Sequence, residues 1–305
     1  MIECVPNVSE GRDRTIIERI AKSIASTGCS VLDIHSDPDH HRSVFTLIGD
    51  EEQIADGAVA LVGSATALID LRSHCGVHPR IGAVDVIPFV PLGAAEMADC
   101  VAVAQHVGRT IADRWALPVY LYGMAARSAH RSSLPWIRRG GFEGLSKKLA
   151  EANGQPDFGP QQPHPTAGAV AVGARHFLVA FNVVLDTANV AIAREIAAVV
   201  REANGGLPGV KALGLSLASR NLAQVSMNLT QVSRDLADLT ATTTVPAVFQ
   251  AVSCEAKRLG VRVLESEIVG LVPKMALDDA TGADLLMQDD PRERILEARI
   301  AGRTA

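Results

Sequence analysis

The sequence predicts an α/β chain of the α+β type, built from two similar halves that are each related to the ferredoxin-like fold. Short apolar runs typical of strands alternate with segments of helical periodicity in the order β-α-β-β-α-β. This order occurs twice, and a long segment rich in Pro and Gly at 153–168 lies between the two runs. With 305 residues, 48% of them hydrophobic, the chain can bury a core in each half.

The first half is predicted to span residues 1–176. We expect strands at 1–6, 29–34, 43–48, 83–90, 118–122 and 169–173, and helices at 13–25, 50–69 and 94–115. Ile16, Ile17, Ile20 and Ile24 recur on one face of the first helix. Asp50 followed by Gln53 matches a capping box and predicts where the second helix begins.

The second half is predicted to span residues 177–280. Strands are expected at 177–185, 210–217, 223–229 and 262–269, and helices at 190–203 and 245–259. The residues after 280 are charged and contain few apolar side chains. We therefore expect 281–305 to form a separate, solvated C-terminal tail.

Charge and cysteine content exclude several classes of protein. There are 29 Lys and Arg against 34 Asp and Glu, a formal charge of −5, whereas a protein that neutralises a nucleic-acid backbone is usually basic. No uncharged run reaches the ~20 apolar residues of a membrane span, and the N-terminus does not resemble a signal peptide. The five cysteines form no CxxC pair. We expect a cytoplasmic protein with reduced thiols, which binds neither nucleic acid nor membranes.

One loop carries the best candidate for chemistry, the run HCGVHPR at 74–80. His78 precedes a buried strand, and Pro79 biases it toward an extended conformation. A neutral imidazole can accept a proton near pH 7, and Arg80 beside it can hold a carboxylate. A histidine that only caps a turn is the alternative. Cys75 is a weaker candidate, as a thiol nucleophile.

A second polar segment contains the side chains of a conceivable metal site: Asp33, His35, Asp37, Asp39, His40 and His41. Alternate residues of an extended segment face one way, which would suit metal binding. Pro38 interrupts that regularity, so we interpret the segment as a solvated β-turn and predict no bound metal. A metal-dependent hydrolase remains the alternative.

Longer strings of residues carry a family resemblance. ECVPNVSEG at 3–11, HPRIGAVDVIPFVPL at 78–92, PDFGP at 156–160, GARHFLVAFNVVL at 173–185 and SEIVGLVP at 266–273 together resemble the formiminotransferase family. That family includes the transferase half of formiminotransferase-cyclodeaminase. The resemblance covers roughly residues 2–280. It implies two α/β halves whose mixed sheets face one another, with the site between them, and a homodimer.

The resemblance also implies an activity and its residues. The expected reaction moves a formimino group between N-formimino-L-glutamate and N5 of tetrahydrofolate, a co-substrate, in histidine degradation. The family's catalytic histidine falls on His78, and Arg80, Arg42 and Arg175 are expected to hold substrate carboxylates. The folate-contacting loop falls on Gly159, Pro160, Gln161, Gln162, Pro163, His164, Pro165, Thr166, Ala167 and Gly168.

The chain departs from the family's usual residues at four positions near this site. Cys75 and Val77 stand where Lys and Glu are common, His41 stands where Asn is common, and His176 replaces a Lys. A related formyl or formimino transferase with a different amino-acid partner therefore remains an alternative. A folate-binding protein without transferase activity is another.

Overall fold

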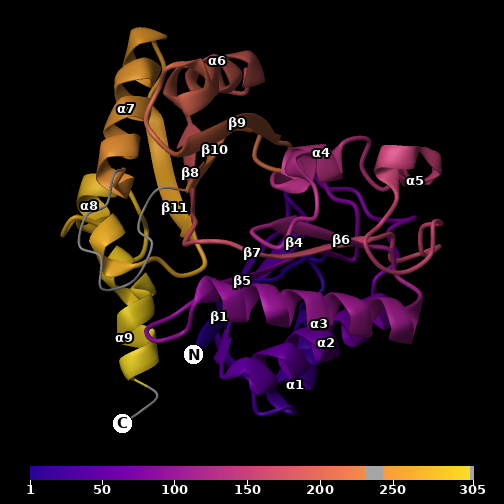
Figure 1. Cartoon of the computed structure of the whole chain (residues 1–305). Coiled ribbons are helices and arrows are strands. Elements are labelled where there is room, and N and C mark those ends of the chain that lie inside the picture. Colours follow the sequence, from indigo (N-terminus) through magenta and orange to yellow (C-terminus); the bar gives the residue numbers. More distant parts are fainter. Residues whose placement is uncertain (231–242, 303–305) are drawn as a thin grey trace. The chain divides into compact units, whose positions relative to one another are not determined.

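The computed structural model describes residues 1–230 and 243–302. By packing, the chain divides into two compact units, Met1–Arg175 and His176–Ala305. The division falls one residue before the boundary that the sequence predicts, and each unit has a sheet of its own (Figure 1).

The sheet of the first unit follows the ferredoxin-like order and then extends it. β1 and β2 lie end to end between β4 and β5, because Pro6 between them has no N–H to donate to a neighbouring strand. The spatial order is β3, β4, β1 with β2, β5, β7, β6, in which the β5–β7 and β6–β7 pairs are parallel. The strands are β1 (Ile2–Cys4), β2 (Asn7–Val8), β3 (Ser30–Asp37), β4 (Arg42–Gly49), β5 (Val84–Pro91), β6 (Val119–Gly123) and β7 (Val170–Ala174).

Three helices, α1 (Arg14–Ala25), α2 (Glu51–Leu68) and α3 (Met97–Trp115), cover one face of this sheet (Figure 1). Asp13 caps α1, and the predicted capping box of Asp50 and Gln53 is present at the start of α2. Apolar side chains of the helices and strands meet in one fully buried core. Its burial is the main source of stability in this unit.

A smaller core lies on the opposite face of the sheet. It joins Ile81, Tyr120 and Tyr122 to the buried side chains of Ile137 and Leu145. The latter belong to short helical elements between β6 and β7: η1 (Ala129–Arg131), α4 (Leu134–Arg138), α5 (Leu145–Ala150) and η2 (Ala152–Gly154). The sequence predicts no element here, because these helices are too short to show a periodicity.

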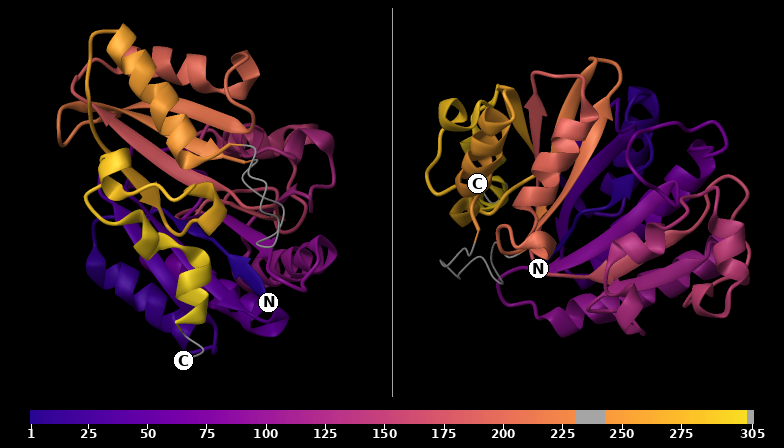
Figure 2. Two further views of the ribbon diagram at one scale, coloured as in Figure 1. Left: turned by 90° about the vertical axis from the view of Figure 1, so that its left-hand side faces the viewer. Right: turned by 90° about the horizontal axis from the view of Figure 1, so that it is seen from above.

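The second unit has the predicted β-α-β-β-α-β order. Its strands lie in the order β11-β8-β10-β9, with α6 and α7 packed on one face (Figure 2). The elements are β8 (Val179–Leu185), α6 (Val190–Val200), η3 (Glu202–Asn204), β9 (Val210–Leu217), β10 (Leu222–Leu229), α7 (Val245–Arg258) and β11 (Val263–Val269). Mixed strand directions occur in the first sheet, whereas every strand pair of the second sheet within the described residues is antiparallel.

The C-terminal residues pack into the second unit, so the prediction of a solvated tail is wrong. Leu285 and Met287 are part of its core, Leu296 is also buried, and Val272 pairs with Ile295. The elements are η4 (Lys274–Ala276), α8 (Gly282–Leu285), η5 (Pro291–Arg294) and α9 (Leu296–Ala301). A few well-placed apolar side chains anchor a segment that is polar on average, and composition alone does not show this.

Candidate active site

His78 lies on the loop between α2 and β5, and its side chain is half-buried. Its Nδ1 is 2.8 Å from the carbonyl oxygen of Pro79. A carbonyl oxygen can only accept a hydrogen bond, so Nδ1 carries the proton of the neutral ring and Nε2 keeps an unprotonated lone pair. This is the tautomer that a histidine needs if Nε2 is to act as a base.

The surroundings of His78 favour its neutral form. Burial lowers the pKa of His78 well below its ordinary value, and the guanidinium groups of Arg42 and Arg138 lower it further. The carboxylate of Asp85 acts in the opposite direction but does not outweigh them. The ring of His40 lies 5.9 Å from that of His78, measured between centroids. At pH 7, His78 is therefore an unprotonated base.

A buried ion-pair cluster lies directly beside this loop. Oδ2 of Asp85 accepts hydrogen bonds from Arg42 at 2.9 Å and from Arg138 at 2.6 and 2.9 Å. Its Oδ1 accepts from the N–H of Ile81 at 2.9 Å. Burial alone would raise the pKa of Asp85, but the two guanidinium groups hold it well below its usual range. Burial in turn lowers the pKa of Arg42 to about 10.

Arg42 is therefore engaged within the protein rather than open to a substrate. Besides Asp85, its guanidinium donates to Oδ1 of Asn7 at 2.8 Å and to the Pro79 carbonyl at 3.0 Å. Its side chain is only 7% exposed. Arg42, which the resemblance assigns to a substrate carboxylate, holds the backbone next to His78 in this structure.

Arg138, Asp85 and Glu143 are absent from the predicted site. Arg138 ends α4, which the burial of Ile137 anchors, and the ammonium group of Lys148 donates to the carbonyls of Trp136 and Ile137. Burial lowers the pKa of Lys148 to about 8.

The sequence contained one clue to Asp85, because a charged residue inside the apolar run 83–90 needs a buried partner. Nothing in the sequence singled out Arg138 among the other arginines.

Arg80 forms a bidentate pair with Glu143 at 2.8 and 3.0 Å. Its Nε also donates to Nδ1 of His74 at 3.0 Å. The guanidinium of Arg80 is 11% exposed, whereas the side chain of Glu143 is 67% exposed. The predicted carboxylate-binding fork is therefore present, and a carboxylate of the chain itself fills it.

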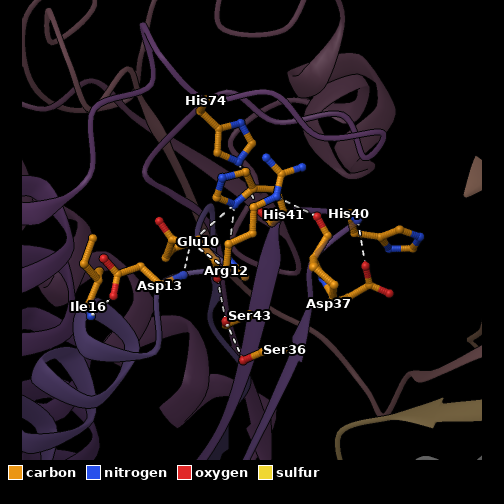
Figure 3. Close-up of polar contacts among 12 residues, drawn as sticks. Glu10, Arg12, Asp13, Ile16, Ser36, Asp37, His40, His41, Ser43 and His74 are labelled. Atoms are coloured by element: carbon orange, nitrogen blue, oxygen red, sulfur yellow. Dashed lines mark hydrogen bonds and ion pairs between the residues drawn. The ribbon is translucent and has the colours of Figure 1, made fainter. Parts of the chain in front are cut away.

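Two histidine rings in contact, tilted by 34° to one another, support the other side of the loop (Figure 3). The ring centroids of His41 and His74 are 4.3 Å apart, and Nε2 of His74 donates to the carbonyl of His41 at 2.9 Å. Glu10 lies 3.5 Å from Nδ1 of His41. Burial is the main cause that lowers the pKa of both histidines. His41, one of the departures from the family, thus packs directly on the loop that carries His78.

The end of the predicted folate loop is joined to the backbone on both sides of the loop that carries His78. Leu71 and Ala83 donate to the carbonyls of Thr166 and Ala167 at 2.9 and 3.0 Å. Gly82 and Gly168 pair so closely that a Cβ on Gly168 would lie 2.1 Å from the carbonyl oxygen of Ile81. Gly168 also has φ +70°, which favours glycine. The His78 loop and the predicted folate loop, which are far apart in the sequence, are thus adjacent.

The beginning of that loop is anchored on β6. Oδ2 of Asp157 accepts from the N–H of Leu121 at 2.7 Å and from Arg131 at 2.9 Å. The ring of Phe158 lies against the guanidinium groups of Arg109 and Arg127. Between the two anchored ends, residues 159–162 are exposed. His164 bends the chain back, accepting from the N–H of Ala167 at 3.0 Å.

Arg175 lies away from His78 along the sheet. Its backbone N–H donates to Phe89 at 3.0 Å, and Phe89 is four residues along β5 from Asp85, about 13 Å. Its side chain hydrogen-bonds Tyr122, whose pKa burial raises to about 12. Tyr122 also lies within electrostatic range of Arg138, so the side chain of Arg175 is linked to the Asp85 cluster through this hydroxyl.

The other candidate residues, those of the metal site considered at 33–41 and Cys75, do not form a binding or catalytic site in the part of the chain that the structure describes. Oδ1 of Asp37 accepts from the N–H of His40 at 2.7 Å, as expected for a turn. No group of three or more His, Cys, Asp or Glu side chains gathers as metal ligands among residues 1–230 and 243–302. Cys75 is exposed and unpaired with another cysteine. No helix of these residues is long and apolar enough to cross a membrane.

Comparison with known proteins places this site in a family. The family described as "Formiminotransferase domain, N-terminal subdomain" matches residues 1–175, and "Formiminotransferase domain" matches residues 180–300. The chain is 42% identical to a glutamate formimidoyltransferase of Streptococcus pyogenes serotype M1, over 99% of both chains.

Two further relatives agree with these matches. A glutamate formimidoyltransferase of Thermoplasma acidophilum is 42% identical over 98% of this chain and 97% of its own. The formimidoyltransferase-cyclodeaminase of Sus scrofa is 41% identical over 98% of this chain, which spans 56% of that longer protein. With both halves matched in order and a relative matched over 99% of its length, the chain belongs to the formiminotransferase family.

Proposed function

We propose that this chain transfers a formimino group between N-formimino-L-glutamate and N5 of tetrahydrofolate, with His78 as the group that carries the proton. The enzyme class, a transferase, follows from the family. The relatives named glutamate formimidoyltransferase support the choice of substrates. The observation that carries the proposal is the 2.8 Å contact between Nδ1 of His78 and the Pro79 carbonyl, which orients the ring and leaves Nε2 as the nitrogen that can accept a proton.

The reaction needs one proton to move between two nitrogens. N5 of tetrahydrofolate attacks the formimino carbon, and the new N5–C bond makes that nitrogen acidic. Nε2 of His78 accepts its proton and returns it to the glutamate nitrogen as the old C–N bond breaks. General acid–base help of this kind contributes about 10²- to 10⁴-fold to the rate. No metal is needed for this balance.

The two anchored ends of the 157–168 segment support a role for this loop in binding tetrahydrofolate. Exposed residues at 159–162 lie between the Asp157 anchor and the Gly168 contact beside the His78 loop. Arg80 supports binding of a substrate carboxylate, because its guanidinium already holds the geometry of a carboxylate fork. A cytoplasmic homodimer is part of the same proposal, and light scattering tests the dimer.

The test is to mix the protein with tetrahydrofolate and N-formimino-L-glutamate and to follow the folate adduct by absorbance. We expect His78→Ala to lower kcat by about 10²- to 10⁴-fold with little change in the affinity for tetrahydrofolate. His106→Ala, an exposed histidine on α3, is the matched control and should keep wild-type turnover.

Other outcomes separate the alternatives. Turnover by His78→Ala at the wild-type rate would remove His78 from the mechanism. Activity only with formiminoaspartate or formiminoglycine would replace the amino-acid partner and keep the reaction class. Binding of tetrahydrofolate with no transfer from any formimino or formyl donor would identify a folate-binding protein instead.

A further inference from the structure

The same three side chains fix the backbone that directly follows His78. Arg42 donates to the carbonyl of Pro79 at 3.0 Å, and Asp85 accepts from the N–H of Ile81 at 2.9 Å. Arg138 in turn donates twice to the carboxylate of Asp85. A shift of this cluster would therefore move the ring of His78, because the cluster holds the backbone at residues 79 and 81, directly after His78.

The charges in this cluster do not balance. Asp85 and Arg42 alone would form a neutral pair, with side chains 0% and 7% exposed. Arg138, 16% exposed, adds a second cation on the same carboxylate oxygen. Burying an uncompensated charge is unfavourable, so neutralising Asp85 does not by itself account for the second arginine.

The packing of the surrounding residues also fixes the position of Arg138. It ends a five-residue helix whose Ile137 is completely buried. The last carbonyls of that helix accept from Lys148, a cap that fixes the end of the helix. The neighbouring Arg139 is exposed and lies outside the cluster. Only one of these two consecutive arginines faces the carboxylate.

We propose that Arg138 is a positioning residue for the transfer reaction: through Asp85 it holds the His78 loop in place, and it supplies the excess positive charge beside His78. The charged and titratable groups that face His78 come from four elements: Arg42 from β4, Arg138 from α4, Asp85 from β5 and His40 from the turn before β4. This inference rests on the proposed function, in which neutral His78 accepts a proton.

The excess charge acts against the imidazolium form of His78. Two guanidinium groups and one carboxylate leave one net positive charge nearby, and a like charge disfavours a cation. Removing Arg138 leaves a neutral pair, so His78 should bind a proton more readily. At the same time the loop loses one of its supports, so Nε2 of His78 should be less well aligned with the substrate nitrogen.

The experiment compares Arg138→Gln, Arg138→Lys and the control Arg139→Gln. The pKa of His78 is measured by NMR titration of histidine-labelled protein, with its resonance assigned from the missing signal of His78→Gln. We expect Arg138→Gln to raise the pKa of His78 by about one unit. Arg138→Lys keeps the charge and should change this pKa by less than half as much, and Arg139→Gln should not change it.

The kinetic readout should move in the same direction. Because the neutral form of His78 is active, the acid limb of kcat/KM should shift to higher pH in Arg138→Gln. Arg138→Lys should keep the wild-type pH profile with a lower kcat, because a lysine cannot form the two-pronged contact. The NMR titration needs no turnover, so a failure of the proposed function and a failure of this inference are distinguishable.

Two results would overturn the inference. One is a folded Arg138→Gln protein whose His78 titrates as in wild type and whose kcat/KM falls equally at every pH, which indicates a purely structural role. The other is a pKa of His78 that rises by a full unit in Arg138→Lys, because that variant keeps the positive charge. This second result decides the question if Arg138→Gln does not fold.

Discussion

Replacing Asp85 with asparagine removes the negative charge between two guanidinium groups. Every group around this carboxylate is a donor: Arg42, Arg138 and the N–H of Ile81. An asparagine must turn its NH₂ group toward one of these donors, so at least one hydrogen bond is replaced by a repulsive contact. Asp85→Asn also leaves an excess of two buried positive charges.

The magnitude follows from the burial of the cluster. Breaking a buried ion pair by removing one partner costs about 3–5 kcal/mol. For a unit the size of residues 1–175, each kcal/mol lowers Tm by about 2–4 °C. We therefore expect Asp85→Asn to lower Tm by about 6–20 °C. Its kcat should fall as well, because the backbone at Ile81 loses its acceptor.

The pH dependence has a defined sign. The pKa of Asp85 is depressed in the folded state, so its stabilisation is complete above the unfolded value of about 3.9 and is lost as the pH falls through the folded value. The difference between wild type and Asp85→Asn should therefore be constant from pH 8 to pH 5.

Urea unfolding at several pH values and differential scanning calorimetry measure this effect. Asp113→Asn, an exposed aspartate on α3, is the matched control and should stay within about 0.5 kcal/mol of wild type. A loss below about 1 kcal/mol for Asp85→Asn would refute the reasoning, because it would mean that the two guanidinium groups do not depend on the carboxylate.

Three further predictions concern the groups around the loop. Glu143→Gln should lower KM for formiminoglutamate up to about fivefold at constant kcat, since it releases Arg80 from an exposed partner; an unchanged KM in steady-state assays would contradict this. Gly168→Ala should weaken binding of tetrahydrofolate and lower Tm more than Gly205→Ala, because both have positive φ but only Gly168 lacks space for a Cβ; equal Tm values in thermal melts would argue against the close contact. The lowered pKa values of His41 and His74 mean that the unfolded chain binds more protons below about pH 6.5. The free energy of unfolding should thus fall from pH 6.5 to 5, and less steeply in His74→Gln, which urea titration at each pH measures; parallel curves would count against it.

Periodicity was sufficient to predict the longer strands and helices of both halves. It did not show that the strand predicted at 1–6 is followed by a second strand, β2, or that the helix predicted at 190–203 ends at Val200. The helix at 13–25 and the capping box at Asp50 match α1 and α2 closely. The region of α4 and α5 could not be predicted this way. A helix of five residues completes little more than one turn, so its apolar face has no repeat to detect.

The sequence predicted which residues could form the candidate site, but not which side chains contact one another there. Spacing and the Pro79 signal selected His78 and Arg80, yet Glu143, the partner of Arg80, is 63 residues away in the sequence. Asp85 carried a detectable anomaly, a charge within an apolar strand. Which of the arginines neutralises it depends on the packing of Ile137 and Lys148, and a sequence pattern does not contain that information.

The place of β7 in the sheet has a consequence for how the chain reaches its native state during synthesis. β7 lies between β5 and β6, so a nascent chain that ends after α5 has no parallel neighbour for either strand. The exposed edge of β5 and the unpaired β6 would then be open to pairing with other chains. The first sheet can be completed only once residue 174 has emerged from the ribosome. We expect stalled chains that end at residue 150 to aggregate, and chains that extend to the end of β7 to remain in solution.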